Sequence, residues 1–265
     1  MSASHRSLSK ESHNQDQQAI LVFTATFNES ENIERLCKDI LATSNNVDVL
    51  VVDDNSPDGT GDILRKLEKE DSRIKSIHRS HKLGVGSAHL LAMEYALEKR
   101  YSGLITLDAD FSHPVRCIPY ILRSLQDNDY VIGSRYMEGG STEYTGIRLL
   151  ISLGANICAR TILGIRITET TSSYRGFNRN ALKAVTSRDI KSNGYSFFIE
   201  VSYWVSRAGL NIHEFPFDFI DRQMGKSKIS KREITKAIYC LGRLFMNRAL
   251  KNHNTVKSNS FNNPA

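Results

Sequence analysis

Closely spaced cysteines are absent from this sequence, which excludes two common uses of the residue. The 265-residue chain holds four cysteines, widely scattered and without a Cys-x-x-Cys pair. A disulfide framework or a zinc site typically shows paired cysteines at short, regular spacings. We therefore expect reduced core thiols in a cytoplasmic protein, at Cys37, Cys117, Cys158 and Cys240.

Long apolar runs are also scarce. No run approaches the ~18–20 apolar residues that cross a bilayer, and the first residues carry no apolar signal region. We expect a protein that is soluble or lies on a membrane without spanning it. Residues 1–18 and 251–265 are polar and aperiodic, which predicts a disordered lead and a disordered tail around one domain at 19–250.

The charge balance favours an anionic partner. The net charge is +6 and the sequence pI is about 9.1, which suits a nucleic acid, a phosphorylated substrate or an acidic membrane surface. The interleaved aromatic and basic patterns of RNA-binding modules are missing. We therefore expect no nucleic-acid partner and favour a phosphorylated substrate or a membrane surface.

Short apolar runs alternate with helical patterns in the first half of the chain. The runs are typical of buried strands, and the segments between them repeat apolar residues every three or four positions. This alternation predicts an α/β fold, with a mostly parallel central sheet and helices on both faces. We place strands at 19–25, 47–52, 74–77, 104–110, 130–133 and 212–220, and later helices at 147–163, 195–206 and 233–251.

Polar side chains follow four of the predicted strands. Ligands of such sheets bind at the carboxyl ends of the strands, so these side chains are expected to meet at one edge. They are Glu29, Asp53, Asp54, Asp108, Asp110 and Arg135.

Asp108 and Asp110 stand two residues apart at the end of one apolar run. On an extended chain such residues point to the same side, and Pro114 suits the first turn of a following helix. Paired carboxylates suit Mg²⁺ or Mn²⁺, which in turn suits phosphate oxygens. The alternative is a polar turn in which the aspartates cap the helix.

A nucleoside diphosphate-sugar would use these groups directly. An aspartate after the second strand can accept a hydrogen bond from a base or a ribose, while the metal neutralises the diphosphate. Remaining basic side chains can bind a second phosphate. The candidates are Arg135, Arg175, Arg222, Lys226 and Lys228.

Six motifs in order closely resemble the dolichyl- or polyprenyl-phosphate mannosyltransferases of glycosyltransferase family 2. They are FNE at 27–29, VVDDNSPDGT at 51–60, LGVGSA at 83–88, DADFSHP at 108–114, GSRY at 133–136 and FIDRQMGKSK at 219–228. The resemblance implies a GT-A fold and transfer of mannose from GDP-mannose to a polyprenyl or dolichyl monophosphate, with inversion and with Mg²⁺ or Mn²⁺.

The resemblance also implies roles for individual residues. Those around the nucleotide are Phe27, Glu29, Val51, Asp53, Asp108 and Ala109, and we add Ala25, Asp54 and Arg175 as substrate contacts. The metal positions are Asp108, Asp110 and Ser112. Arg135, Arg222 and Lys228 match positions that grip the diphosphate or the acceptor phosphate, and Asp110, Arg135 and Arg222 are the catalytic candidates.

Three positions depart from the family pattern. Related sequences usually have Pro at Ala25, Tyr at Phe27 and Asp at Glu169. The first two leave open another donor, such as UDP-glucose, with a lipid-phosphate or glycan acceptor. The helices at 147–163 and 233–251 are predicted to pack in the core, or alternatively to lie on a membrane. A peripheral place at the cytoplasmic face, with a small membrane anchor subunit, follows from the second alternative.

Overall fold

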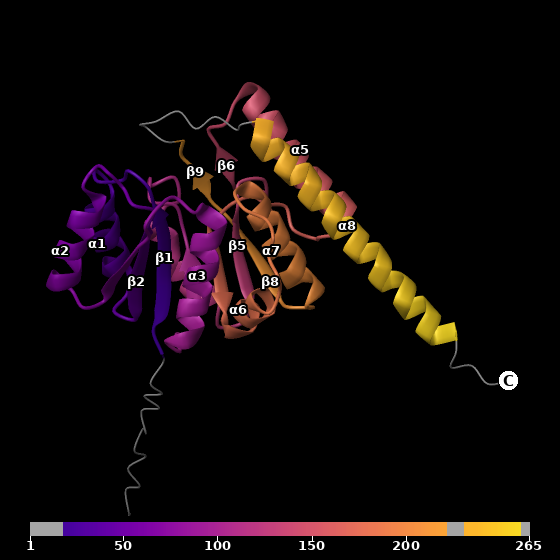
Figure 1. Cartoon of the computed structure of the whole chain (residues 1–265), viewed down its shortest axis with the longest axis horizontal. Helices are drawn as coiled ribbons and strands as arrows, with labels where there is room; N and C mark the ends of the chain where they lie inside the picture. Colours follow the sequence, from indigo (N-terminus) through magenta and orange to yellow (C-terminus); the bar gives the residue numbers. More distant parts are fainter. Residues whose placement is uncertain (1–17, 222–230, 261–265) are drawn as a thin grey trace, which may run out of the picture.

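A seven-stranded sheet forms the centre of the part of the chain that the computed structural model describes, residues 18–221 and 231–260. The strands lie in the order β3-β2-β1-β4-β7-β5-β8 (Figure 1). Every neighbouring pair is parallel except the two that involve β7. The bounds are β1 Ile20–Thr26, β2 Val47–Asp53, β3 Ile74–His78, β4 Gly103–Thr106, β5 Tyr130–Ser134, β7 Arg175–Asn178 and β8 Ile212–Pro216. A separate short ribbon pairs β6 Ser141–Thr142 with β9 Asp218–Phe219.

Helices cover both faces of this sheet, because its strands are apolar on both sides. In β1, Leu21 and Phe23 belong to one buried cluster and Val22 to the other. The helices are α1 Ile33–Thr43, α2 Thr60–Glu70, α3 Val85–Glu98, α4 Ile118–Ser124, α5 Gly146–Leu163, α6 Arg179–Thr186, α7 Tyr195–Arg207 and α8 Lys231–Ser260, with a 3₁₀ turn at Val115–Cys117. Helices α1, α2 and α4 pack on one face, and α3, α6 and α7 on the other. The predicted α/β class with a mostly parallel sheet is confirmed.

The fourth predicted strand was drawn too long. β4 ends at Thr106, and residues 107–110 form the turn that follows it. Asp108 and Asp110 therefore do not share a side by strand alternation, and the turn itself sets where they point. Pro114 precedes the 3₁₀ turn and does not open a long helix, since α4 begins only at Ile118.

An antiparallel strand that the sequence did not predict enters the sheet between β4 and β5. β7 pairs Arg175 with Thr106 of β4 and with Ile132 of β5. No strand was predicted in this stretch. Its polar residues before Arg175 lie in the preceding loop, and only four residues are extended.

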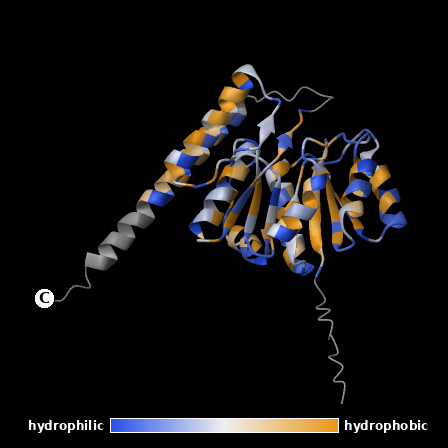
Figure 2. Ribbon diagram, turned by 180° about the vertical axis from the view of Figure 1, so that it is seen from behind, coloured by the Kyte–Doolittle hydropathy of each residue, from blue (hydrophilic) through white to orange (hydrophobic). Residues whose placement is uncertain are grey.

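Helices α5 and α8 lie side by side along one flank of the molecule (Figure 1). α5 is long and apolar enough to cross a membrane by length and composition, so the expectation that no such segment exists is wrong. Only 22% of that helix is buried, so most of it does not act as a core helix. Figure 2 shows apolar residues along α5 and the first part of α8. The exposed ones are Ile147, Leu150, Ile157, Ile162, Ile238, Tyr239, Phe245 and Met246.

The chain ends differ in part from the expectation. α8 extends to Ser260, so a helix occupies most of the stretch predicted as a disordered tail. Residues 1–17 and 261–265 lie outside the described part, and the prediction of disorder for them stays a prediction.

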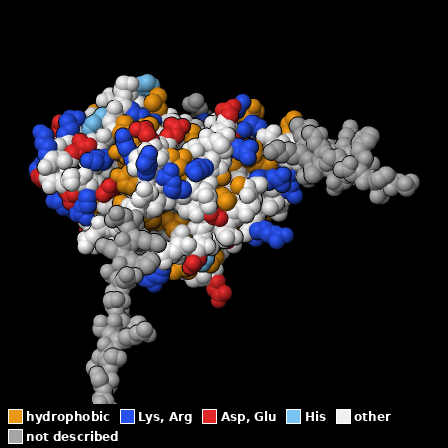
Figure 3. Space-filling view, turned by 90° about the horizontal axis from the view of Figure 1, so that it is seen from below, with side chains coloured by type: hydrophobic (Ala, Val, Ile, Leu, Met, Phe, Trp, Pro, Cys, Tyr) orange, Lys and Arg blue, Asp and Glu red, His pale blue; other side chains and the backbone are white. Residues whose placement is uncertain are grey.

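At the amino end of the strands, basic and acidic side chains are interspersed over the visible face (Figure 3). The net positive charge is thus mixed with acids on that face.

Candidate active site

The carboxyl ends of β1, β2, β4 and β5 form one edge of the sheet. β1 lies between β2 and β4, with Thr26 level with Asp53 and Phe23 level with Thr106. The turn at Asp108 therefore lies across the end of β1 from Asp53. Arg135 directly follows β5, which is parallel to β4 but separated from it by β7. The structure brings the predicted acids and Arg135 to the same edge.

The turn after β4 is fixed by short polar contacts. The Ser173 hydroxyl donates to Asp108 Oδ1 at 2.6 Å, and the backbone N–H of Asp108 donates to His113 Nδ1 at 3.0 Å. Asp110 Oδ1 accepts from the Ser112 N–H at 3.1 Å. The Asp108 side chain keeps 38% of its surface exposed, so the turn is rigid while this carboxylate stays open to a ligand.

His113 packs against this turn. Its Nδ1 already accepts a hydrogen bond from the Asp108 N–H, so this atom is not available to a metal. Its ring is buried and stacks on Tyr174 with centroids 4.9 Å apart. Burial lowers the pKa of His113 against the opposing effect of Asp108. A neutral ring that accepts at Nδ1 carries its proton on Nε2.

The residues at the predicted metal position fit a hard divalent cation. Among the described residues, the buried Ser112 hydroxyl has no hydrogen-bond partner, and an unsatisfied buried oxygen calls for an explanation such as a bound ion. Asp108 and Asp110 add carboxylate oxygens nearby in the same turn. Within residues 18–221 and 231–260, no group of three His, Cys, Asp or Glu side chains could hold a metal. A cation here would need further oxygens from water or from a diphosphate.

The acids after β2 organise their own turns. Asp53 is 2% exposed, and its Oδ1 accepts from the hydroxyls of Thr26 at 3.0 Å and Ser56 at 2.5 Å. Asp54 pairs with Arg79 and accepts from the Gly84 N–H at 3.3 Å. A nucleotide that contacts either carboxylate must share or replace these bonds.

The predicted contacts at the end of β1 are more open. Phe27 exposes 38% of its surface, and Lys82 Nζ lies 4.1 Å from its ring centroid. Glu29 Oε2 accepts from Asn32 Nδ2 at 2.8 Å, and the Glu29 N–H donates to the Thr60 hydroxyl at 3.1 Å. Ala25 is half-buried against the core.

The side chains of three predicted substrate contacts are buried. Val51 is fully buried in the middle of β2, and its side chain packs in the core. Arg175 is 1% exposed, and its guanidinium donates to three carbonyl oxygens, of Ser172 at 2.6 Å, Thr170 at 2.8 Å and Phe198 at 3.0 Å. These N–H groups of the guanidinium are already hydrogen-bonded within the protein. Arg175 therefore joins β7 to its neighbours and does not bind phosphate. Ala109 is also buried, at 4%.

Three predicted basic contacts cannot be placed. Arg222, Lys226 and Lys228 lie outside the described residues. Their roles stay predictions.

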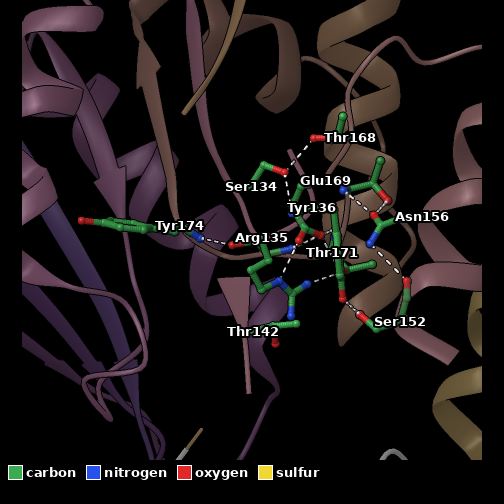
Figure 4. A network of polar contacts seen from close by, with 12 residues as sticks. Ser134, Arg135, Tyr136, Thr142, Ser152, Asn156, Thr168, Glu169, Thr171 and Tyr174 are labelled. Atoms are coloured by element: carbon green, nitrogen blue, oxygen red, sulfur yellow. Dashed lines mark hydrogen bonds and ion pairs between the residues drawn. The ribbon is translucent and has the colours of Figure 1, made fainter. Parts of the chain in front are cut away.

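Arg135 is held within a network of polar contacts (Figure 4). It is 6% exposed, and its Nε donates to Glu169 Oε2 at 2.7 Å. Burial alone would lower the pKa of Arg135, but the Glu169 carboxylate outweighs it and raises that pKa. Burial would likewise raise the pKa of Glu169, and the Arg135 charge holds it below its usual value. Both groups are therefore charged at neutral pH.

A cavity of about 530 Å³ opens beside Asp108 and Arg135. Its polar lining also includes His113, Ser152, Thr171, Ser172, Ser173 and Glu233, whereas most of its surface is apolar. The apolar lining comes from three helices: Ile151 and Ala155 of α5, Phe198 and Ile199 of α7, and Ile234, Ala237, Ile238 and Leu241 of α8. The cavity was not predicted, although the apolar spacing of the two amphipathic helices is visible in the sequence. The cavity can hold a molecule with an anionic head and a long apolar body.

Comparison with known proteins identifies the family of this fold. The family described as "Glycosyl transferase family 2" matches residues 21–186, which include both acidic turns and Arg135. The chain belongs to glycosyl transferase family 2. The expected resemblance and the expected glycosyltransferase class are confirmed.

Two relatives match over most of their own length. The undecaprenyl-phosphate mannosyltransferase of Micrococcus luteus is 34% identical over 220 residues, covering 83% of this chain and 90% of the relative. The polyprenol monophosphomannose synthase of Mycolicibacterium smegmatis is 35% identical over 225 residues, covering 84% and 85%.

Solved structures support the fold. The glucosyl-3-phosphoglycerate synthase of Mycobacterium tuberculosis, in complex with Mn²⁺, UDP and glucosyl-3-phosphoglycerate, aligns with a TM-score of 0.64 at 17% identity. The alignment covers 86% of this chain and 80% of that chain. This glycosyltransferase 2 domain therefore has a GT-A-type fold.

Proposed function

We propose that this glycosyltransferase moves mannose from GDP-mannose to a polyprenyl or dolichyl monophosphate. The observation that carries the proposal is the cavity, which joins Asp108 and Arg135 to apolar walls from α5, α7 and α8. A lipid monophosphate has the matching halves, an anionic head and an apolar tail. The names of the two curated relatives support the same acceptor class and sugar.

The donor would bind at the ends of β1, β2 and β4. Asp53 and Glu29 are the proposed contacts of the nucleoside, and Phe27 offers an exposed ring. Asp108, Asp110 and Ser112 would hold Mg²⁺ or Mn²⁺, and the Mn²⁺ in the complex of the aligned synthase supports a divalent cation in a protein of this fold. The cation would neutralise charge that develops on the leaving diphosphate.

The acceptor would supply its own nucleophile. A phosphate monoester is already anionic at neutral pH, so we assign no general base. One phosphate oxygen attacks the anomeric carbon of mannose, the bond from that carbon to the diphosphate breaks, and GDP leaves. Attack opposite the leaving group inverts the configuration. Arg135, with Arg222 and Lys228, would bind the phosphates and orient them.

The membrane surface is the proposed location of the reaction. The exposed apolar side chains of α5 and α8 lie next to the cavity. Arg160 of α5 is exposed among them, whereas Arg148 and Lys236 on the same helices are paired with Asp221 and Glu233. Apolar and basic side chains on one surface suit an anionic lipid interface. A peripheral place at the cytoplasmic face fits the free cysteines, and a small membrane anchor subunit is a further proposed partner.

A transfer assay tests the donor and the acceptor together. Purified protein with Mn²⁺ is incubated with radiolabelled GDP-mannose, GDP-glucose, UDP-glucose or UDP-N-acetylglucosamine and with polyprenyl phosphates of several lengths. Label is expected in the organic phase with GDP-mannose only. Label from UDP-glucose would establish the alternative donor, for which the departures at Ala25 and Phe27 leave room. No transfer from any donor would refute the proposal.

A further inference from the structure

One edge of the Arg135 guanidinium is fully occupied by protein. Nε donates to Glu169 Oε2 at 2.7 Å, and Nη2 donates to the Thr171 hydroxyl at 2.9 Å. That hydroxyl in turn donates to Glu169 Oε1 at 2.8 Å. A single buried carboxylate thus holds the Nε/Nη2 edge, once directly and once through Thr171 (Figure 4).

The loop that carries this carboxylate is itself anchored. Glu169 Oε1 accepts from the backbone N–H groups of Thr171 at 2.8 Å and Ser172 at 3.1 Å. The N–H of Thr170 donates to Asn156 Oδ1 of α5 at 2.6 Å. The loop therefore keeps Glu169 and Thr171 in place. If Arg135 changed rotamer, it would lose its hydrogen bonds to both residues.

The other edge of Arg135 is open toward the cavity. No residue in the described ranges accepts a hydrogen bond from Nη1, whereas Arg135 lines the cavity beside Asp108. Three rings surround the guanidinium, with centroids 5.1 Å (Tyr136), 5.3 Å (Phe219) and 5.4 Å (Tyr144) from its central carbon. They narrow the space in which the guanidinium can move. A free Nη1/Nη2 edge matches two oxygens of one phosphate.

We propose that Glu169 and Thr171 are positioning residues that present the Nη1/Nη2 edge of Arg135 to the phosphate of the lipid acceptor. This inference rests on the proposed function, because it takes the cavity as the acceptor site. Glu169 is fully buried and does not line the cavity, whereas Thr171 borders the cavity with its hydroxyl bonded to both Arg135 and Glu169. Together Glu169 and Thr171 hold the Arg135 side chain in its binding orientation before the acceptor arrives. Less conformational entropy of this long side chain is then lost when the phosphate binds.

Thr171→Val tests the inference with little risk to the fold. Valine keeps the shape of threonine and removes the hydroxyl that accepts from Nη2. Thr170→Val is the matched control in the same loop, since its hydroxyl bonds to Asn156 and not to Arg135. Farnesyl phosphate, a soluble short polyprenyl phosphate, serves as acceptor in transfer assays and as ligand in calorimetry without donor or metal.

The expected result is a split between binding and turnover. Thr171→Val should raise both the KM and the Kd for farnesyl phosphate about tenfold, as loss of one hydrogen bond to a charged group implies. The kcat and the KM for GDP-mannose should stay near the wild-type values, and Thr170→Val should change none of the four. Glu169→Gln should weaken farnesyl phosphate binding further, and Glu169→Asp should restore part of it.

Each other outcome overturns a stated claim. Equal acceptor constants for Thr171→Val and Thr170→Val would refute the positioning role, as would a loss of kcat without a change in KM or Kd. If the wild-type protein binds no farnesyl phosphate and transfers no mannose to it, the proposed function fails and the inference fails with it. If the wild-type protein transfers mannose and the variants have the same KM and Kd for farnesyl phosphate, only the inference is refuted.

Discussion

Asp108 and Asp110 differ in what surrounds them, although they share one turn. Asp108 accepts from the Ser173 hydroxyl and lines the cavity. Asp110 accepts from the Ser112 N–H beside the unpartnered Ser112 hydroxyl. Such a turn holds its oxygens in place before a cation arrives, so less order has to be created on binding.

Asp110→Ala is expected to abolish sugar transfer and leave the fold intact. Loss of one charged metal ligand should reduce kcat at least about 100-fold, in the range found when preorganised electrostatic groups are removed. The side chain is only partly buried, so the melting temperature should change little. Transfer is measured in buffer with Mn²⁺, and circular dichroism reports the fold.

Asp127→Ala provides the control, because this acid lies in the turn after α4, at the opposite end of β5 from Arg135. It should transfer sugar at the wild-type rate. Near-normal turnover by Asp110→Ala would count heavily against the metal assignment.

At the scale of elements, α5 serves two different neighbours. Its buried side includes Asn156, which holds the Thr170 loop, and Ser152, which accepts a hydrogen bond from the Tyr136 hydroxyl at 2.6 Å. Its other side exposes Ile147 and Leu150, by 77% and 68%. One helix thus connects the loop that holds Arg135 with an apolar surface, which places the cavity next to the surface where lipid would be found.

Replacing both exposed residues, as Ile147→Glu with Leu150→Glu, should release the protein from membranes. Binding to vesicles of anionic phospholipid is expected to fall at least about tenfold, because two apolar contacts are lost and two like charges are added. Neither residue lines the cavity, so transfer to soluble farnesyl phosphate should persist. Sedimentation with vesicles measures the first quantity.

Tyr120→Glu on α4 is the control, since this exposed apolar residue is remote from α5 and α8 in the fold. Its vesicle binding should match that of the wild-type protein. Unchanged binding by the α5 variant would show that the membrane contact lies elsewhere.

At the scale of the whole molecule, stability depends on a buried histidine that does not itself line the cavity. His89 of α3 lies between Phe23 and Phe198, with ring centroids 4.9 Å and 5.0 Å away. Burial lowers its pKa to about 3, helped by the Arg175 charge. The folded protein therefore holds His89 neutral, whereas the unfolded chain protonates it near its ordinary pKa of about 6.5.

The free energy of unfolding should fall as the pH drops below about 6.5. Because the unfolded state binds the proton first, His89 contributes its full stabilisation above that pH and loses about 1.4 kcal/mol per unit below it, down toward the folded pKa. Urea unfolding between pH 7.5 and 4.5 measures the slope.

His89→Leu isolates this contribution, since leucine fills a similar volume and cannot titrate. The slope of the unfolding free energy against pH, between pH 6.5 and 5, should decrease by about 1.4 kcal/mol per unit. Part of the slope that remains should come from His113, whose pKa is also lowered by burial. An unaltered slope in the variant would show that His89 is not the group responsible.

The sequence by itself determined the sheet and the acids at its edge. Apolar runs and turn residues are local signals, so β1, β2, β3 and β5 were found close to their true bounds. Parallel strands bring their carboxyl ends to one edge whatever fills the rest of the protein, and this placed Asp53, Asp108 and Arg135 together. Family motifs, which are also local, identified the chemistry.

Only the tertiary structure decided which of these side chains remain available to a ligand. The antiparallel insertion of β7 buries Arg175 among carbonyl oxygens, and no local pattern reveals that choice. Glu169 meets Arg135 across 34 positions of sequence, and α5 meets α8 to enclose the apolar cavity. Burial and pairing between distant segments depend on how layers pack, so they become visible only when the chain is folded.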